Sequence, residues 1–436
     1  MRPAGYPPQK FLQTNDMDPT TRRQSLRGPS LLLHNVGVAP QLTIRPGHPL
    51  FLDLPWSSSI ADWQLPILLD LPKGISRHEV RFLSFPEGTY AVKELATDLA
   101  HNDYTVLRAL EGVGAPAVHA VGIVEHRDPD PTAEHSAALI TVYEPFSFSY
   151  REMLAGPGFG ARRSQLLDAF AGLLVELHLA RCFWGDCSLS NVLYRFDADA
   201  IETIMVDAET ARIYDQHLTD GQRTEDIEIM VENVAGGMAD IAAEAGVDLD
   251  QADLELGYDI AERYENLWAE LGQATKVGVD ERYLVTERVE RLNRLGFDVE
   301  EVDLLPSLDD TSEMIIKVRV GSRNFHANRL KALTGIDALE NQAKAILADV
   351  HYFSARYADS AASKATLAIR WRATEFEPMM STLAALAGVS DPIQAYCDVL
   401  NHRYHLAKTM GADVSTTDAY QDWLASGRPG YPFSYA

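Results

Sequence analysis

A short polar stretch in the middle of the chain constrains its fold more than any other part of the sequence. It runs from Trp184 to Asn191 and is followed, after an apolar run, by Asp207. Transfer of a phosphoryl group from a magnesium nucleotide requires a carboxylate that orients the attacking hydroxyl, and oxygen ligands that hold the metal on the phosphates. This stretch contains both, with Asp186 for the hydroxyl and with Asn191 and Asp207 for the metal. The same ligands would also serve nucleotidyl transfer.

The stretch resembles the protein-kinase-like phosphotransferases and, among them, the lipopolysaccharide (Kdo/WaaP) kinase type. The resemblance rests on Leu177-His178, Gly185-Asp186 and Asn191-Val192-Leu193. It implies a two-lobed α+β fold with a small β-rich N-lobe and a helical C-lobe, and the use of ATP and Mg²⁺. There are two departures. Trp184 replaces the family's His, which leaves open how the loop is braced, and Asp207-Ala208-Glu209 replaces Asp-Phe-Gly, so a switch based on a Phe flip is not expected.

Four residues before the stretch are candidates for nucleotide binding. Lys93 lies in Ala91-Val92-Lys93 on an expected strand and resembles the kinase lysine that grips the α- and β-phosphates; a solvated surface lysine is the alternative. Asp103, on an expected helix, matches the acid that pairs with this lysine, although it is one methylene shorter than the family's Glu. Gly74 would contact the nucleotide or simply form a hairpin turn. Glu144 opens the segment whose backbone would bind adenine.

Two residues outside the stretch are expected to have structural roles. Asp226 would brace the loop from below, as an Asp does in related kinases, or would serve as a cap or surface residue. His178 is expected to pack or hydrogen-bond rather than to catalyse.

Composition narrows the class of protein. A chain of 436 residues suggests at least two domains. Its formal net charge of −25 would repel nucleic acid and anionic membranes, so neither is expected as a partner. Cys182, Cys187 and Cys397 are too few for a disulfide framework, which fits a reducing cytoplasm, and reduced thiols are favoured over a zinc site. No run reaches the ~18 apolar residues of a membrane helix, and residues 1–30 lack the apolar middle of a signal peptide.

The order of elements predicts three parts: a flexible tail over 1–45, a kinase-like domain over 46–275 with its lobes meeting near 143, and a mostly helical C-terminal domain over 281–436. In the kinase-like domain we expect strands at 60–71, 78–85, 89–95 and 137–143, and helices at 98–112, 164–182 and from 223 to about 272. After a linker at 276–280, we expect helices at 281–295, 338–357, 363–386 and 391–410, and a β-hairpin of strands 299–305 and 314–320. From about Glu281 the chain resembles a domain of unknown function that is fused to this kinase type in actinobacterial proteins.

A basic cluster is conspicuous in so acidic a chain. Residues 314–331 contain no acid, and they contain Lys317, Arg319, Arg323, Arg329 and Lys331. The cluster either docks on the acidic kinase lobe or binds an anionic ligand, such as a phosphate or carboxylate on the acceptor.

The acceptor itself is expected to be a small hydroxylated molecule or a glycan-type metabolite. Protein kinases commonly recognise protein substrates through a long activation segment ordered by an Arg before the catalytic Asp. Here Gly185 takes the place of that Arg before Asp186, and the next helical run after Asp207 begins near Arg223, so the segment is short. The sequence therefore indicates an ATP-dependent phosphotransferase that moves the γ-phosphate to a hydroxyl. The alternative is a pseudokinase or nucleotide-binding scaffold whose C-terminal domain binds a partner.

Overall fold

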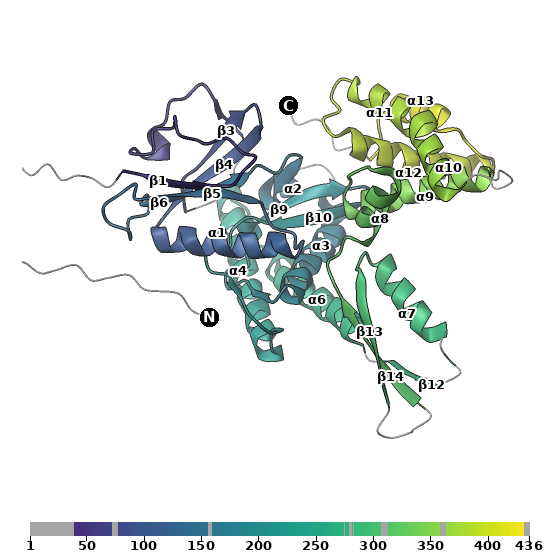
Figure 1. Cartoon of the computed structure of the whole chain (residues 1–436), viewed down its shortest axis with the longest axis horizontal. Coiled ribbons are helices and arrows are strands. Elements are labelled where there is room, and N and C mark those ends of the chain that lie inside the picture. Colours follow the sequence, from purple (N-terminus) through teal and green to yellow (C-terminus); the bar gives the residue numbers. More distant parts are fainter. Residues whose placement is uncertain are drawn as a thin grey trace, which may run out of the picture. The chain divides into compact units, whose positions relative to one another are not determined.

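The N-lobe is built on one antiparallel sheet of six strands, ordered β1-β5-β6-β4-β3-β2 (Figure 1). Its strands are β1 (Gln41–Ile44), β2 (Leu68–Leu69), β3 (Val80–Phe85), β4 (Gly88–Leu95), β5 (Ala120–Glu125) and β6 (Ala137–Val142). The computed structural model describes residues 39–71, 77–155, 159–273, 275–278, 281, 283–306, 313–357 and 363–430. Most of the expected N-terminal tail therefore lies outside the described residues.

The end of the expected tail forms the edge strand β1, so that boundary was wrong. Residues Gln41 to Ile44 pair with Gly122 to Glu125 of β5. The approach is close because Gly122 has no side chain. A Cβ at this position would lie 2.5 Å from Ile44 Cδ1 and 2.6 Å from the Thr43 carbonyl oxygen. A glycine inside an apolar strand often marks such a close backbone approach.

The two faces of this sheet are covered differently. Helix α1 (Thr97–Gly112) packs on β5 and β6 and buries Val106, Leu107 and Leu110, which recur at helical spacing. The other face is covered by residues 51–63, whose Trp56 and Trp63 contact each other. This covering segment contains a 3₁₀ turn (Ile60–Asp62), so the strand expected over 60–71 is limited to Leu68–Leu69.

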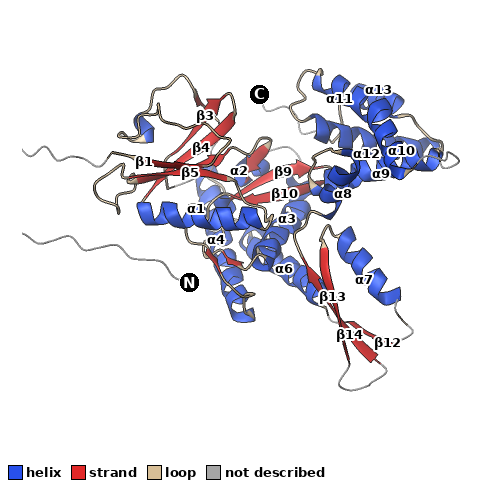
Figure 2. Cartoon of the chain, in the orientation of Figure 1, coloured by secondary structure: helices blue, strands red, loops and turns tan. Residues whose placement is uncertain are grey.

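The C-lobe is mainly helical (Figure 2). Its helices are α2 (Tyr150–Ala155), α3 (Phe159–Leu179), α4 (Asp220–Ala245), α5 (Gln251–Leu254) and α6 (Leu256–Gly272), with a 3₁₀ turn at Leu189–Asn191. Its strands are β7 (Ser147–Ser149), β8 (Cys182–Phe183), β9 (Val192–Asp197), β10 (Ala200–Met205) and β11 (Arg212–Ile213). Helix α4 begins at Asp220 because Thr219 and Gln222 form a capping box. The apolar residues that recur at helical spacing along α3, from Leu166 to Leu177, are buried.

The C-terminal domain combines a three-stranded sheet with helices. The sheet has the order β12-β14-β13, formed by β12 (Thr275–Gly278), β13 (Val299–Pro306) and β14 (Glu313–Val320). The helices are α7 (Tyr283–Arg294), α8 (Phe325–Thr334), α9 (Glu340–Arg356), α10 (Lys364–Trp371), α11 (Glu377–Ala384), α12 (Pro392–Met410) and α13 (Thr416–Ala425).

Three local expectations for this domain were wrong. The expected linker contains strand β12, which pairs with β14. Helix α8 lies within the stretch that contains the basic cluster, where no helix was expected. The single helix expected over 363–386 is interrupted by a π-helical turn at Arg372–Phe376, between α10 and α11.

The β9–β10 hairpin of the C-lobe contacts the C-terminal domain through specific hydrogen bonds. Buried Asp197 accepts bonds from the backbone nitrogens of Asn341 (2.8 Å) and Gln342 (2.6 Å), at the start of α9. The Gln394 side chain accepts a bond from the Ala198 nitrogen (2.8 Å) and donates one to the Ala198 carbonyl (2.9 Å). Because a carboxylate and an amide satisfy these backbone groups, the hairpin and the C-terminal domain are held together by buried polar contacts.

The predicted fold class is confirmed: a β-rich N-lobe precedes a helical C-lobe, and a mostly helical C-terminal region follows. Cys182, Cys187 and Cys397 are free and buried. Among the described residues, no helix has the length and apolar character needed to span a membrane.

Candidate functional site

Lys93 is held by three carboxylates. Its Nζ lies 3.1 Å from Asp103 Oδ2, 2.8 Å from Asp207 Oδ2 and 3.4 Å from Glu209 Oε2. Burial by itself lowers the pKa of Lys93, but the contacts with Asp103 and Asp207 outweigh it, so the net shift is upward. Burial raises the pKa of Asp103 to about 6, against the opposing effect of Lys93. The ion pair expected between strand and helix is therefore present.

Asn102 ties the helix that carries Asp103 to the segment after Asp207. The Asn102 side-chain amide lies within hydrogen-bond distance of the carbonyls of Ala208 (3.3 Å), Glu209 (2.8 Å) and Ala211 (3.0 Å). Asp103 Oδ1 also accepts a bond from the Ala208 nitrogen at 3.1 Å. These bonds hold α1 close to the segment after Asp207. Sequence analysis missed Asn102 because its acceptors lie on a distant segment.

Asp226 supports the loop that carries Asp186. It is fully buried, and it accepts bonds from the backbone nitrogens of Trp184 (2.7 Å) and Gly185 (2.8 Å). Its Oδ2 also lies 3.1 Å from His178 Nε2. Asp226 therefore lies where it was predicted to brace the loop. His178 hydrogen-bonds to the Asp226 carboxylate.

Trp184 ties the same loop to Asp207. Its indole nitrogen donates to the Asp207 carbonyl at 2.9 Å. The replacement of His by Trp therefore keeps a side-chain hydrogen bond at this position. Gly185, next along, has φ +76°, a left-handed conformation that glycine adopts without strain.

Asp186 is oriented by two asparagines. Asn233 Nδ2 donates to Asp186 Oδ1 at 3.0 Å, and Asn191 Nδ2 donates to the Asp186 carbonyl at 3.0 Å. Burial and the neighbouring charge of Asp207 raise the pKa of Asp186. A raised pKa makes this carboxylate a better proton acceptor. Asn233, on α4, is a second residue that sequence analysis missed.

The donor set fits magnesium held together with phosphates. The Asn191 side-chain nitrogen donates to the Asp186 carbonyl, and this bond does not use the side-chain oxygen Oδ1, the atom that could bind a metal. Within the described ranges, no group of three or more His, Cys, Asp or Glu is arranged to hold a metal by itself. Protein sites for Mg²⁺ usually provide one or two carboxylates and leave the other positions to water and phosphate oxygens. Asn191 and Asp207 match that pattern.

Glu209 is a further acidic group at the site, besides Asp103, Asp186 and Asp207. Its side chain is almost fully buried. It forms an ion pair with Arg77, and its Oε2 lies 2.9 Å from His78 Nε2. Burial, followed by the charge of Lys93, lowers the pKa of His78. Glu209 thus links the strand that carries Lys93 to the loop before β3.

A cavity of about 450 Å³ opens onto these groups. Asp186, Asn191 and Asp207 line one part of it, and α4 lines another. The α4 residues at the cavity are Glu232, Asn233, Gly236, Gly237, Asp240 and Ile241. A Cβ at Gly236 would have no neighbour within 4 Å, so the cavity is open along that helix.

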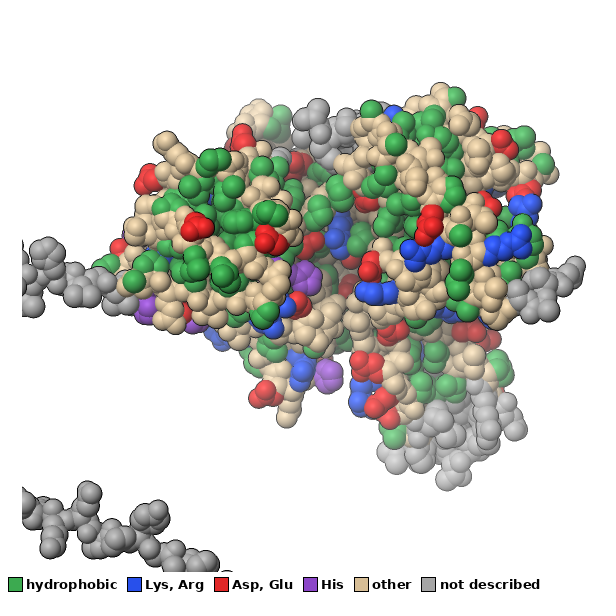
Figure 3. Space-filling model, turned by 45° about the horizontal axis from the view of Figure 1, so that its top comes forward, with side chains coloured by type: hydrophobic (Ala, Val, Ile, Leu, Met, Phe, Trp, Pro, Cys, Tyr) green, Lys and Arg blue, Asp and Glu red, His purple; other side chains and the backbone are tan. Residues whose placement is uncertain are grey.

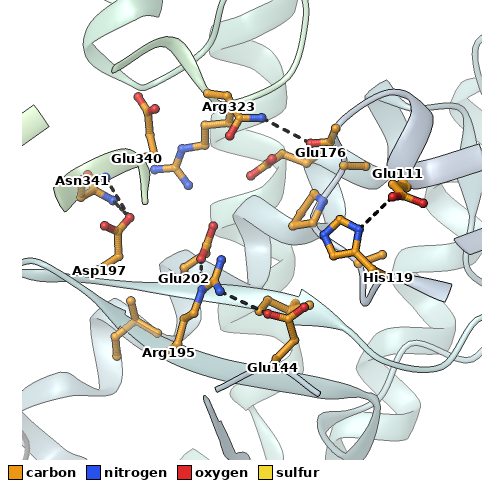
Figure 4. A pocket seen from close by; sticks show the side chains of 17 residues that line it. Glu111, His119, Glu144, Glu176, Arg195, Asp197, Glu202, Arg323, Glu340 and Asn341 are labelled. Carbon is orange, nitrogen blue, oxygen red and sulfur yellow. Dashed lines mark hydrogen bonds and ion pairs between the residues drawn. The ribbon is translucent and has the colours of Figure 1, made fainter. Parts of the chain in front are cut away.

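Glu144, a predicted nucleotide contact, does not line this cavity. Gly74 lies outside the described residues. The Glu144 side chain lies 3.3 Å from Arg195 and lines a different cavity (Figure 4). The contact of the backbone at 144–146 with adenine stays a prediction.

The basic cluster does not gather at Asp186. None of its five residues lines the cavity of that aspartate. Arg319 and Lys331 form ion pairs of 2.7 Å with Glu301 and Asp337. On the face drawn in Figure 3, basic side chains stand among acidic ones. We therefore do not propose that the cluster binds the acceptor.

The rest of the cluster is dispersed as well. Lys317 lies opposite Asp303 in the β13–β14 pair, Arg329 is exposed, and Arg323 lies next to Gly172 of α3. The alternative, docking on the kinase lobe, fits Arg323 alone.

Comparisons with known proteins found a family model that matches part of the chain and similar solved structures. No curated protein matches the chain. One solved structure that is similar is entitled "WaaP in complex with acyl carrier protein", with 17% identity and a TM-score of 0.32, over 51% of this chain and 88% of that one. Residues 266–427 match the family described as "Domain of unknown function (DUF4032)"; the match begins within α6 and contains every helix and strand from β12 to α13.

Proposed function

We propose that this chain is an ATP-dependent phosphotransferase that acts on a hydroxyl of a small-molecule or glycan-type acceptor. One observation carries the proposal: Lys93, the Asp186–Asn191 loop and Asp207 come from three separate segments and meet around one site. A lysine paired with a helix acid, two metal ligands and an oriented carboxylate are the parts that phosphoryl transfer requires.

Each residue has a role that its surroundings support. Lys93 would bind the phosphates as a positive charge, held in place by Asp103. Asn191 and Asp207 would hold Mg²⁺, which neutralises negative charge on the phosphates when it is bound. Asp186 would orient the acceptor hydroxyl and take its proton. Asn233 fixes the Asp186 carboxylate for this task, at 3.0 Å.

The cavity supports a small acceptor. Its volume of about 450 Å³ lies within the range of small-molecule sites. Helix α4 begins at Asp220, soon after Asp207, which leaves a short segment where protein kinases have a long one. The acceptor hydroxyl would approach Asp186 along α4, beside Gly236.

The test uses Asp207→Asn with Asp199→Asn as control, because Asp199 is an exposed aspartate in the same lobe. A ligand at one hundred times its Kd stabilises a folded protein by about 2.7 kcal/mol. Magnesium-ATP should raise the melting temperature of the wild type and of the control, but not of Asp207→Asn. Equal stabilisation of all three proteins would remove Asp207 from the site.

A second measurement separates an enzyme from a scaffold. The full chain is incubated with magnesium, labelled ATP and fractionated cell extract, and label should appear in a small-molecule fraction. Label on protein bands alone would refute the proposed acceptor class. Binding of ATP without transfer to any acceptor or to water would favour the pseudokinase alternative.

A further inference from the structure

A second cavity lies between the kinase-like part and the C-terminal domain. It has a volume of about 370 Å³ and shares no lining residue with the cavity of Asp186. Helix α3 contributes Glu176 to its wall, the β9–β10 hairpin contributes Arg195 and Glu202, and the C-terminal domain contributes Arg323 and Glu340 (Figure 4).

Most charged groups of this cavity already have partners. Arg195 forms ion pairs with Glu144, at 3.3 Å, and with Glu202. Glu340 Oε1 lies 2.6 Å from His326 Nδ1. The Glu340 carboxylate also accepts hydrogen bonds from the backbone nitrogens at the start of α8. Asp197 accepts hydrogen bonds from the backbone nitrogens at the start of α9. These groups shape the cavity, but their bonding capacity is largely used.

Glu176 and Arg323 are the two charged groups that are left over. Among the described residues, no hydrogen bond or ion pair reaches the Glu176 carboxyl within 4.0 Å. Arg323 donates its Nε to the Leu295 carbonyl at 3.0 Å, and its terminal nitrogens make no such bond within the described ranges. Figure 4 shows both side chains pointing into the cavity, Glu176 from α3 and Arg323 from the segment after β14. One is acidic and the other basic.

We propose that this cavity binds a small zwitterion, with its ammonium group on Glu176 and its carboxylate on Arg323. Arg323 presents the planar fork of donors that suits a carboxylate. The surrounding acids Glu202 and Glu340 disfavour a ligand that is only anionic. Arg323 disfavours one that is only cationic. A ligand with both charges satisfies both unpaired groups and joins α3 to the C-terminal domain.

The proton on Glu176 gives the site a signature. Burial raises the pKa of Glu176 to about 8; Arg323 acts against this shift, while Glu202 and Glu340 add to it. An ammonium group favours the ionised carboxylate, so binding below that pKa must release a proton. Affinity should therefore rise with pH, by roughly twentyfold between about pH 6.5 and about pH 8.5 if the bound pKa falls below this range.

The experiment is calorimetric titration of the full chain with four probes of equal carbon number. These are 4-aminobutyrate, a zwitterion; putrescine, a dication; succinate, a dianion; and neutral 1,4-butanediol. The zwitterion should bind at least tenfold more tightly than the other three, with proton release seen as a dependence of the heat on the buffer. No ATP is needed, so the result is independent of the proposed transferase activity.

Two variants locate the binding. Glu176→Gln and Arg323→Gln should each weaken 4-aminobutyrate binding at least tenfold, and Glu176→Gln should abolish the proton release. Asp168→Asn, an exposed acid on the same helix, should bind like the wild type. Melting temperatures near that of the wild type will show that the variants are folded.

Three outcomes would overturn the inference. Putrescine or succinate binding as tightly as 4-aminobutyrate would show a different ligand class. Unchanged affinity in Glu176→Gln would place the zwitterion elsewhere. Absence of binding by all four probes would leave the cavity as a docking interface only.

Discussion

Substitution of Asp226 tests how the catalytic loop is built. Its carboxylate accepts two backbone N–H groups, at 2.7 and 2.8 Å, in a fully buried place. Hydrogen bonds to a charged group contribute about 1.5–3 kcal/mol each. Asp226→Asn keeps the shape but has only one acceptor oxygen. The asparagine oxygen can still accept the bond from the Trp184 N–H. The asparagine NH₂ group then faces the N–H of Gly185.

That arrangement loses one charge-assisted bond and leaves a buried donor without an acceptor. We expect Asp226→Asn to reduce the free energy of unfolding by about 2–3 kcal/mol. Urea unfolding followed by tryptophan fluorescence measures the change, since Trp184 is buried beside the substitution. The control is Glu225→Gln, the exposed neighbour on the same helix, which should change stability by less than about 0.5 kcal/mol. A loss in Asp226→Asn no larger than in the control would refute the reasoning.

Three further substitutions test other parts of the structure. Asp186→Ala should keep ATP affinity within a few-fold and lose about 10²-fold or more in turnover of labelled ATP; a parallel loss of affinity would contradict its role. Arg127→Ala leaves buried Glu94 without its ion pair and should cost about 3–5 kcal/mol in urea unfolding, and less in a double variant with Glu94→Ala. Burial raises the pKa of Asp398 to about 8, so folding takes up a proton between about pH 4 and about pH 8 and stability falls as pH rises through that window. The melting temperature of Asp398→Asn relative to wild type should therefore increase from about pH 5 to about pH 9; a constant difference would contradict this.

The sequence alone determined the residues closest to the proposed chemistry. Asp186 and Asn191 lie within one loop, so their separation along the chain nearly fixes their separation in space. Lys93 and Asp103 were paired through the resemblance to the kinase type, which relates an acid on the helix to the lysine on the preceding strand. Alternating and helical patterns also located the β3–β4 hairpin and the core face of α3.

Only the tertiary structure decided which distant groups meet. Asn102 and Asn233 look like ordinary polar helix positions, and their roles follow from acceptors on the segments of Ala208 and Asp186. The residues of the basic cluster are close together in the sequence but separate in the structure. Arg319 pairs with Glu301 of β13, and Arg323 lines a separate cavity together with Glu176 of α3. Local sequence sets backbone preferences over a few residues. The partner of a buried polar group is set by which apolar faces pack, and that depends on the whole chain.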